Sequence, residues 1–318
     1  MEEKNTNSLF NVPIEGKEFK RLIVIDGNAI IHRAFHALPP LTTKKGELVN
    51  AVYGFLLVFF KAIKEFQPDF VAACFDLPAP TFRHKKFGDY KANRPKAPDE
   101  LYNQLPKTKE ILGAFNVAIF EKEGFEADDI IGTIAKIAPQ RQAFPPIETI
   151  ILSGDLDTLQ LVNSHTKVYF LRKGVKDTVL YDENLVKEKY QGLGAEQLSD
   201  FKALRGDPSD NIPGVPGIGE KTAIELIKEF ESLEYLYECL EQKKETGEEI
   251  KKKLTPRILS LLKENKDQAF FSKMLATIHK NVPINFNFKK CQWGKYDKEK
   301  AVRLLKGLEF YSLIERLP

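Results

Sequence analysis

Gly124-Phe125-Glu126-Ala127-Asp128-Asp129 places three carboxylates within four positions, directly before an apolar run, 130–135, that is typical of a buried helix. A helix start uses one acid to cap free N–H groups, and further acids add repulsion. A divalent cation would remove this repulsion, because carboxylate-rich sites suit hard cations. Helix capping and metal binding both explain the stretch, so the rest of the chain must distinguish them.

Acids also follow the other predicted strands. The runs are Arg21–Ile25 before Asp26, Phe70–Phe75 before Asp76, Asn116–Phe120 before the stretch 124–129, and Thr149–Leu152 before Asp155 and Asp157. A fifth run, 167–171, carries no comparable acid. One Asp after a strand is usually a turn or an N-cap. In a parallel sheet, however, the carboxyl ends share one edge, where ligands bind. Seven acids at four strand ends therefore predict an α/β fold with a convergent acidic site.

The composition is that of an ordinary globular protein. The chain has 318 residues, of which 42% are hydrophobic and 29% charged, and its net charge is +3. Three widely spaced cysteines, Cys74, Cys239 and Cys291, form neither a disulfide framework nor a metal-ligand spacing. The polar N-terminus lacks a signal-peptide core, and the apolar run 51–60 is too short to span a bilayer. We expect a cytoplasmic protein without a membrane partner.

A basic segment lies between the second and third strands. Residues 82–96 hold six Lys or Arg against one Asp, with aromatic residues between them. A charge run alone is usually a solvated loop. Here it follows Asp76 and would overhang the acidic edge, and basic residues with stacking aromatics are typical of single-strand binding. Lys91 and Arg94 are three apart and are predicted to share a helix face.

A glycine-rich turn follows a region, 182–204, that is predicted to be helical. It runs Pro213-Gly214-Val215-Pro216-Gly217-Ile218-Gly219 and opens a predicted helix that ends near Phe230. Backbone N–H groups at such a turn can hold a phosphate, although a plain packing motif explains it too. Asp207 and Asp210 lie just before it and add two carboxylates. The proline-rich stretch 138–147 is predicted to be a surface loop, and 301–317 an amphipathic helix and tail.

Together these stretches resemble the 5′-nuclease domain of bacterial DNA polymerase I, a member of the flap endonuclease superfamily. The matching stretches, in the family's order, are Val24–Gly27, Phe75-Asp76, Phe82–His84, Tyr90-Lys91, Glu126–Asp129, Ser153–Asp157 and Gly206–Gly214. The resemblance implies a mostly parallel α/β sheet of the PIN or resolvase-like type. It also implies a helical arch and a C-terminal helical subdomain with a helix-hairpin-helix.

The resemblance implies a two-metal phosphodiesterase that acts on 5′ ends and 5′ flaps of DNA in replication and repair. Two Mg²⁺ ions are expected, with Mn²⁺ as a substitute. The first ion would lie among Asp26, Asp76, Glu126 and Asp128, and the second would be shared with Asp155, Asp157 and Asp210. Asp207 and Asp129 would lie in or near the outer shell.

DNA contacts also follow from the resemblance. Lys91 would contact the scissile phosphate, with Arg94 and Arg33 as phosphate partners, and Tyr90 would stack on a base. The other expected contacts are Arg83, Lys85, Lys86 and Lys96 of the arch, and Gly214, Gly217, Gly219, Lys221 and Thr222 of the hairpin. A K⁺ ion is expected at the hairpin.

The predicted organisation has four parts: a flexible arm, 1–20; the catalytic domain, 21–190, with an arch at about 82–105; the helix-hairpin-helix DNA-binding domain, 191–290; and a tail, 291–318. We expect a monomer that binds DNA with a 5′ flap or 5′ end and works with a polymerase domain in the same or a separate chain. RNA in the cleaved strand is left open, because an arch that reads the backbone is tolerant.

Three other functions compete with this interpretation. A non-catalytic module that binds branched DNA would use the same arch and hairpin, but it predicts gaps in the acid set, and the sequence has none. A phosphatase would use Asp155-Leu156-Asp157 as an Asp-x-Asp nucleophile, but it has no use for a glycine hairpin. An RNA-directed nuclease of the same superfamily fits the residues as well.

Overall fold

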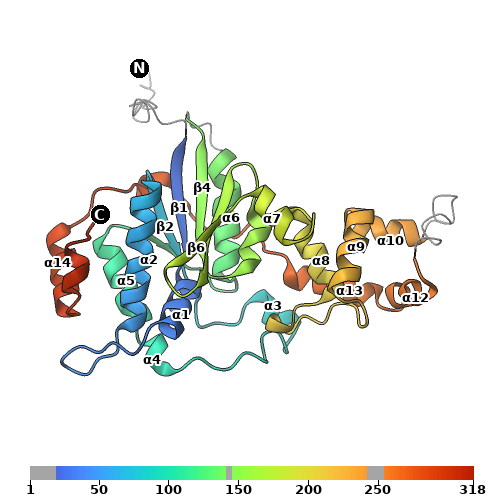
Figure 1. Cartoon of the computed structure of the whole chain (residues 1–318), viewed down its shortest axis with the longest axis horizontal. Coiled ribbons are helices and arrows are strands. Elements are labelled where there is room, and N and C mark those ends of the chain that lie inside the picture. Colours follow the sequence, from blue (N-terminus) through green and yellow to red (C-terminus); the bar gives the residue numbers. More distant parts are fainter. Residues whose placement is uncertain (1–18, 141–144, 242–253) are drawn as a thin grey trace, which may run out of the picture.

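The computed structural model describes residues 19–140, 145–241 and 254–318. Most of the predicted arm, 1–20, and residues 141–144 and 242–253 therefore lie outside the described residues. A six-stranded sheet in the order β3-β2-β1-β4-β5-β6 forms the centre of the molecule (Figure 1). Its strands are β1 (Lys20–Asp26), β2 (Phe70–Cys74), β3 (Ala118–Phe120), β4 (Ile147–Ser153), β5 (Thr166–Lys173) and β6 (Asp177–Tyr181).

All neighbouring strands are parallel except β5 and β6, which form an antiparallel edge pair. The predicted fold class is confirmed, and β6 is the one strand of the described residues that the sequence analysis did not predict. Strand residues alternate between two cores, as the period of two requires. Ile23 and Ile25 of β1 pack in one core, while Leu22 and Val24 pack in the other.

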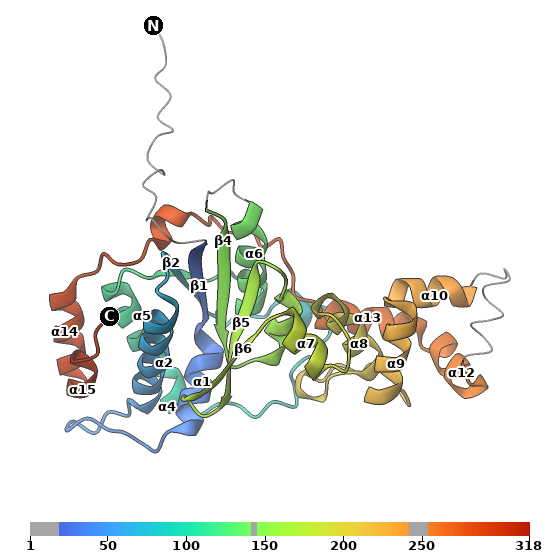
Figure 2. The same cartoon turned by 45° about the horizontal axis from the view of Figure 1, so that its top comes forward.

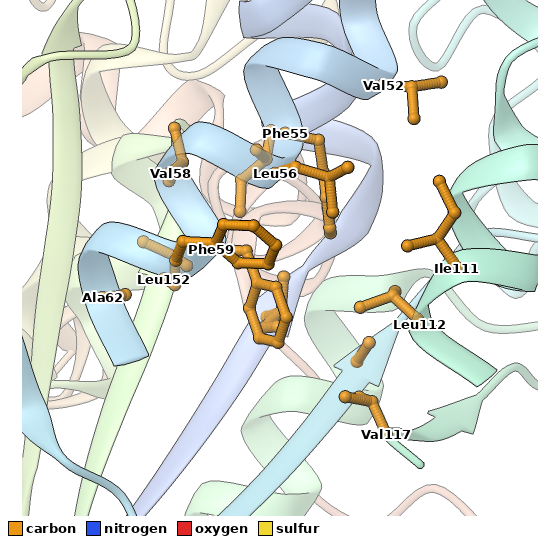
Figure 3. Packing of buried hydrophobic residues seen from close by; sticks show 14 of the residues in the cluster. Val52, Phe55, Leu56, Val58, Phe59, Ala62, Ile111, Leu112, Val117 and Leu152 are labelled. Carbon is orange, nitrogen blue, oxygen red and sulfur yellow. The ribbon is translucent and has the colours of Figure 1, made fainter. Parts of the chain in front are cut away.

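Helices cover both faces of the sheet (Figures 1 and 2). One face carries α1 (Gly27–Ala37), α2 (Asn50–Phe66) and α5 (Leu105–Ala114), and the other carries α6 (Ala127–Gln140). Phe55 and Phe59 of α2 are fully buried with Ile111 and Leu112 of α5 (Figure 3). This layer holds α1 against the sheet, so the start of α1 is fixed at the carboxyl end of β1.

A second, helical lobe lies beyond β6 and α7 (Glu183–Lys189) in Figure 1. It has its own core, which includes Leu204, Ile227 and Leu236. Its helices are α8 (Leu198–Arg205), α9 (Glu220–Phe230), α10 (Leu233–Glu241), α12 (Pro256–Glu264) and α13 (Lys266–Ala276). Short 3₁₀ turns precede it at Leu156–Leu161 and Ala195–Gln197, and another lies within it at Pro208–Asp210.

The basic segment differs from the predicted helical arch. It contains only two short helices, α3 (Phe82–Lys86) and α4 (Asp99–Tyr102), joined by turns and extended backbone. Lys91 has a positive φ of 58°, which no helix residue adopts. The expectation that Lys91 and Arg94 share a helix face is therefore wrong, although a turn links them through the Arg94 N–H and the Lys91 carbonyl, 3.0 Å apart.

Two further expectations differ at element boundaries. The predicted loop 138–147 is shorter, because α6 continues through Pro139 to Gln140 and β4 begins at Ile147. The region predicted to be an amphipathic helix and tail, 301–317, contains two helices: after a 3₁₀ turn at Phe288–Cys291, α14 (Lys298–Gly307) and α15 (Tyr311–Ile314) follow, and Leu305 and Leu313 pack into the core beside α2. No helix of the described ranges is long and apolar enough to cross a membrane.

Candidate active site

The carboxyl ends of β1, β2 and β4 and the start of α6 surround one pocket of about 390 Å³. Five of the nine predicted acids line it: Asp26, Asp76, Glu126, Asp128 and Asp155. Arg33 and Arg94 also line the pocket, and so does Lys91. The shared sheet edge thus brings together acids that are up to 129 positions apart in the chain.

Asp26 is held by the transition from β1 to α1. Its Oδ1 accepts the Ala29 N–H at 3.0 Å, which caps α1, and its Oδ2 accepts the Ser153 hydroxyl at 2.6 Å. The side chain is buried, and this burial raises its pKa to about 7 against the pull of those hydrogen bonds. The nearby Asp155 and Asp76 carboxylates act in the same direction as burial.

The other pocket acids are fixed in similar ways. Asp76 accepts the Ala127 N–H at 2.7 Å and so joins the end of β2 to the start of α6. Asp155 accepts the Asp157 N–H at 2.9 Å in the turn after β4. Desolvation raises the pKa of Asp128 well above its ordinary value, and repulsion from Asp26 and Asp155 adds to the effect. The pocket therefore gathers carboxyl groups whose ionisation is opposed by burial and by their neighbours.

Glu126 faces the basic segment. Its Oε2 accepts the Lys91 ammonium at 2.9 Å and the Tyr90 hydroxyl at 3.3 Å. Burial opposes the charge on Lys91, but Glu126 holds the pKa of Lys91 well above its usual value. The lysine thus stays cationic inside the pocket wall.

The other four predicted acids point to basic partners and are absent from the pocket lining. Lys202 of α8 binds both Asp157 and Asp207, at 2.6 Å from the Asp207 Oδ2. Burial acts to raise the pKa of Asp207, but Lys202 and Ser209 hold it below its usual value. Arg94 pairs with Asp210, which also accepts the Tyr90 hydroxyl at 3.2 Å.

Asp129 is the fourth of these acids, and it is fully buried. Its two carboxylate oxygens each accept a hydrogen bond from one terminal nitrogen of Arg83, at 2.8 Å. This pair neutralises the Asp129 charge, and Asp129 does not line the pocket, so its expected place in or near the outer shell of the metal site stays a prediction. Within the three described ranges, no three His, Cys, Asp or Glu side chains stand close enough together, in their present positions, to hold a metal ion.

Two expected DNA contacts are corrected by burial. The Tyr90 ring is only 3% exposed and packs near Ile212 and Leu275, so it is not available to stack on a base. Arg83 is likewise 3% exposed and is held by Asp129. By contrast, Lys85, Lys86 and Lys96 are exposed.

The residues of the glycine hairpin also differ in their exposure to solvent. Gly214 is buried against the Gly206 backbone, and its N–H donates to the Ser272 hydroxyl at 3.0 Å, so this amide is already used. Gly217, Gly219 and Lys221 are exposed at the start of α9, and Thr222 is half-buried there. These exposed residues leave the amino end of α9 open to solvent.

Sequence reasoning missed several residues of the site. Lys202 pairs with two predicted metal ligands, Asp157 and Asp207. The sequence signal for this pairing was that Lys202 lies five positions before Asp207. His32 and His36 line the pocket one helical turn apart on α1, six and ten positions after Asp26. Ser153 holds Asp26, which only the pairing of β1 with β4 makes visible.

The chain matches two protein families over adjoining segments. One is described as 5′-3′ exonuclease, N-terminal resolvase-like domain, and covers residues 21–191; the other, 5′-3′ exonuclease, C-terminal SAM fold, covers 193–299. DNA polymerase I of Bacillus subtilis is 44% identical over 94% of this chain, and that of Caldicellulosiruptor bescii is 42% identical over 93%. The chain spans about a third of the length of these relatives, 32% and 33%.

Solved structures share the fold. The T5 D15 protein, co-crystallised with metal ions, superposes with a TM-score of 0.64 at 18% identity over 93% of this chain and 99% of that one. The catalytic core of Rad2 in complex with a DNA substrate gives a TM-score of 0.58 at 16% identity, covering 94% of this chain and 91% of that one. At these identities the likeness concerns the fold alone.

Proposed function

Because the chain belongs to the 5′-3′ exonuclease family, we propose that it is a nuclease that hydrolyses phosphodiester bonds of DNA at 5′ ends and 5′ flaps. The observation that carries the proposal is the pocket at the strand ends, where five carboxylates face Lys91, Arg94 and Arg33. Carboxylates and phosphate-binding cations in one cavity suit a reaction at a phosphate group.

The donor set fits hard divalent cations, and we propose two Mg²⁺ ions, with Mn²⁺ as a substitute. Asp26, Asp76, Glu126, Asp128 and Asp155 would hold them. Burial raises the pKa of Asp26 and of Asp128, and repulsion from neighbouring acids adds to it; a bound cation would favour the ionised form of both groups. Mg²⁺ keeps several of its water ligands, so the acids that lie too far away to coordinate the ion directly would bind it through these waters. Such ions, when bound, would supply a nucleophile at neutral pH and neutralise the leaving oxygen.

The basic side chains of the pocket would bind and orient the DNA backbone. Lys91 would exchange Glu126 for the scissile phosphate, and Arg94 would exchange Asp210 for a neighbouring one. Arg33 is anchored to the Gly154 carbonyl at 3.1 Å and would hold a phosphate from the opposite wall. The exposed hairpin amides at Gly217 and Gly219, with Lys221, would bind duplex backbone.

The same proposal includes the domain division at 21–190 and 191–290 and a K⁺ ion at the hairpin. DNA with a 5′ flap or 5′ end is the proposed partner. The relatives are named DNA polymerase I, so we also propose that a polymerase domain works with this chain.

A second candidate is a non-catalytic module that binds branched DNA. One observation favours it: in the part of the chain that the structure describes, no three acids are gathered for a metal ion. Internal cations also satisfy Asp157, Asp207 and Asp210 without any added ion.

The test is cleavage of a 5′-labelled flap duplex with Mg²⁺ or with EDTA, beside a blunt duplex and a free single strand. We expect Mg²⁺-dependent cutting near the flap junction that is lost in EDTA. Asp155→Ala should abolish cutting and leave DNA binding largely intact, while Glu299→Ala, at an exposed acid of α14, should change neither. Tight flap binding without cutting under any divalent ion would favour the binding module.

A further inference from the structure

Arg83 and Asp129 form a buried ion pair between α3 and α6. The two terminal nitrogens of Arg83 each donate to one Asp129 oxygen at 2.8 Å. The side chains are 3% and 0% exposed, so the pair is removed from solvent. A bidentate pair of this kind fixes the relative orientation of both groups as well as their distance.

The pair also binds the end of the helical lobe. Arg83 donates from Nε to the Leu275 carbonyl at 2.9 Å and from Nη2 to the Thr277 carbonyl at 2.7 Å. The His279 N–H donates to Asp129 Oδ1 at 2.8 Å. Figure 1 shows α3 close to this side of the lobe. Three separate parts of the chain therefore meet at one pair of charges: the base of the basic segment, the start of α6 and the exit from α13.

The same pair contacts Glu126, which lines the acidic pocket. Asp129 Oδ2 accepts the backbone N–H of Glu126 at 3.1 Å. The Arg83 Nη1 lies 3.7 Å from Glu126 Oε2, the oxygen that also accepts Lys91. Asp129 thus fixes the Glu126 backbone, and by pairing with Arg83 it limits the pull of that guanidinium on the Glu126 side chain.

We propose that Arg83 and Asp129 are positioning residues that set the orientation of Glu126 in the pocket and tie it to the helical lobe. The role in catalysis rests on the proposed nuclease function. Neither residue touches the pocket; they act through Glu126. This assigns to Asp129 a role other than metal ligand, and to Arg83 a role other than DNA contact.

The consequence of breaking the pair follows from the charges that stay behind. In Asp129→Asn the buried guanidinium of Arg83 loses its counterion, and the nearest other carboxylate is Glu126 at 3.7 Å. Glu126 would turn toward Arg83 and away from the pocket. A divalent ion would then lose a ligand, although every pocket acid is still present.

The experiment compares wild type with Asp129→Asn in three measurements. We expect hydrogen exchange of the Glu126 and His279 amides to rise about tenfold or more. The Kd for Mn²⁺, measured by titration without DNA, should rise by about tenfold or more. The kcat for flap cleavage should fall while KM for the flap stays within about twofold.

Asp200→Asn is the matched control. Asp200 is also buried, accepts the Leu233 N–H at 3.0 Å and pairs with Lys273, but it lies in the helical lobe. We expect it to lower the denaturation midpoint and leave the Mn²⁺ Kd unchanged. If Asp129→Asn does not fold, Arg83→Lys, which cannot make the bidentate pair, serves in the same comparison with the same expected results.

The inference is overturned if the folded variant only lowers the denaturation midpoint, as Asp200→Asn does, and binds Mn²⁺ with the wild-type Kd. Failure of the proposed function is a separate outcome. If the wild-type chain neither cuts DNA nor binds Mn²⁺, that function fails. The exchange rates of the Glu126 and His279 amides then still show whether the Arg83–Asp129 pair fixes the backbone at these two residues.

Discussion

Two opposing effects act on the ionisation of Asp26. Its hydrogen bonds to Ala29 and Ser153 favour the carboxylate, while burial and neighbouring acids favour the protonated form. Burial prevails, and the pKa reaches about 7. The residue is therefore most easily ionised when a cation is close by.

The free energy of unfolding should accordingly fall as pH rises when divalent ions are removed. Asp26, with a pKa of about 7, and Asp157, with about 6, bind protons more tightly in the folded chain than at their ordinary value of 3.8. Their contribution is complete below pH 4 and is lost as pH rises to about 7. Urea unfolding in EDTA should show a loss of about 1–3 kcal/mol between pH 5 and 8.

Asp26→Asn is the control for this effect, and it should make the loss smaller than in wild type. An excess of Mg²⁺ should reduce the loss in wild type, since the ion replaces the proton. A free energy of unfolding that is flat from pH 5 to 8 in EDTA would contradict the assignment.

Lys91 is the residue at which we expect binding and chemistry to separate. It stays cationic beside Glu126 and reaches the pocket. Lys91→Ala should slow single-turnover cleavage by about 100-fold or more and weaken flap binding by no more than about threefold. Lys300→Ala, at an exposed lysine of α14, should leave the cleavage rate unchanged. Equal losses of rate and affinity would make Lys91 a simple phosphate anchor.

At the level of the elements, the packing of α1 against α2 sets the position of one wall of the pocket. They approach so closely at Gly54 that an added Cβ would lie 2.7 Å from the Ala34 Cβ and 2.8 Å from Leu38 Cδ1. Helix α1 carries His32, Arg33 and His36 into the pocket. The spacing of these two helices therefore sets the position of the basic wall.

Gly54→Ala should lower the free energy of unfolding by about 1–3 kcal/mol, because α1 or α2 must move to admit the methyl group. Gly113 in α5 is the matched control: it is exposed, and an added Cβ would meet nothing within 4 Å. Gly113→Ala should raise the free energy of unfolding by about 0.5–1 kcal/mol. Urea unfolding measures both, and a neutral Gly54→Ala would show that the two helices are not in tight contact.

The same elements show how far sequence reasoning reaches. Apolar runs predict β1, β2 and β4 because buried parallel strands are continuously hydrophobic, and an acid after each run places the pocket. The edge strand β6 was missed because it is only half-buried and carries a weak pattern. Pairings between segments far apart in the sequence, such as Lys202 with Asp157 and Arg83 with Asp129, were missed because no local pattern encodes which cation meets which acid.

At the scale of the whole molecule, residues 89–94 join the helical lobe to the acidic pocket. The Lys91 N–H donates to the Asp210 carbonyl at 3.0 Å, and the Asn211 amide to the Asp89 carbonyl at 2.7 Å. The Asn93 amide donates to the Pro208 carbonyl at 2.5 Å. These contacts hold the basic segment against the lobe in the chain without DNA.

Asn93→Ala should loosen this contact. We expect trypsin to cut after Lys91 about threefold faster than in wild type, since one side-chain hydrogen bond is lost. Asn103→Ala, at an exposed position in the same connection, should leave the cutting rate unchanged. Equal rates for wild type and Asn93→Ala would show that the segment is held by other contacts.

The proposed nuclease requires that the acids at the strand ends hold divalent ions. The most direct measurement is the anomalous diffraction of Mn²⁺ in crystals of this chain. We expect peaks within the pocket that Asp26, Asp76, Glu126, Asp128 and Asp155 line, and their loss in Asp155→Ala. Crystals soaked in Mn²⁺ that show no peak in this pocket, or peaks only at surface carboxylates, would contradict it.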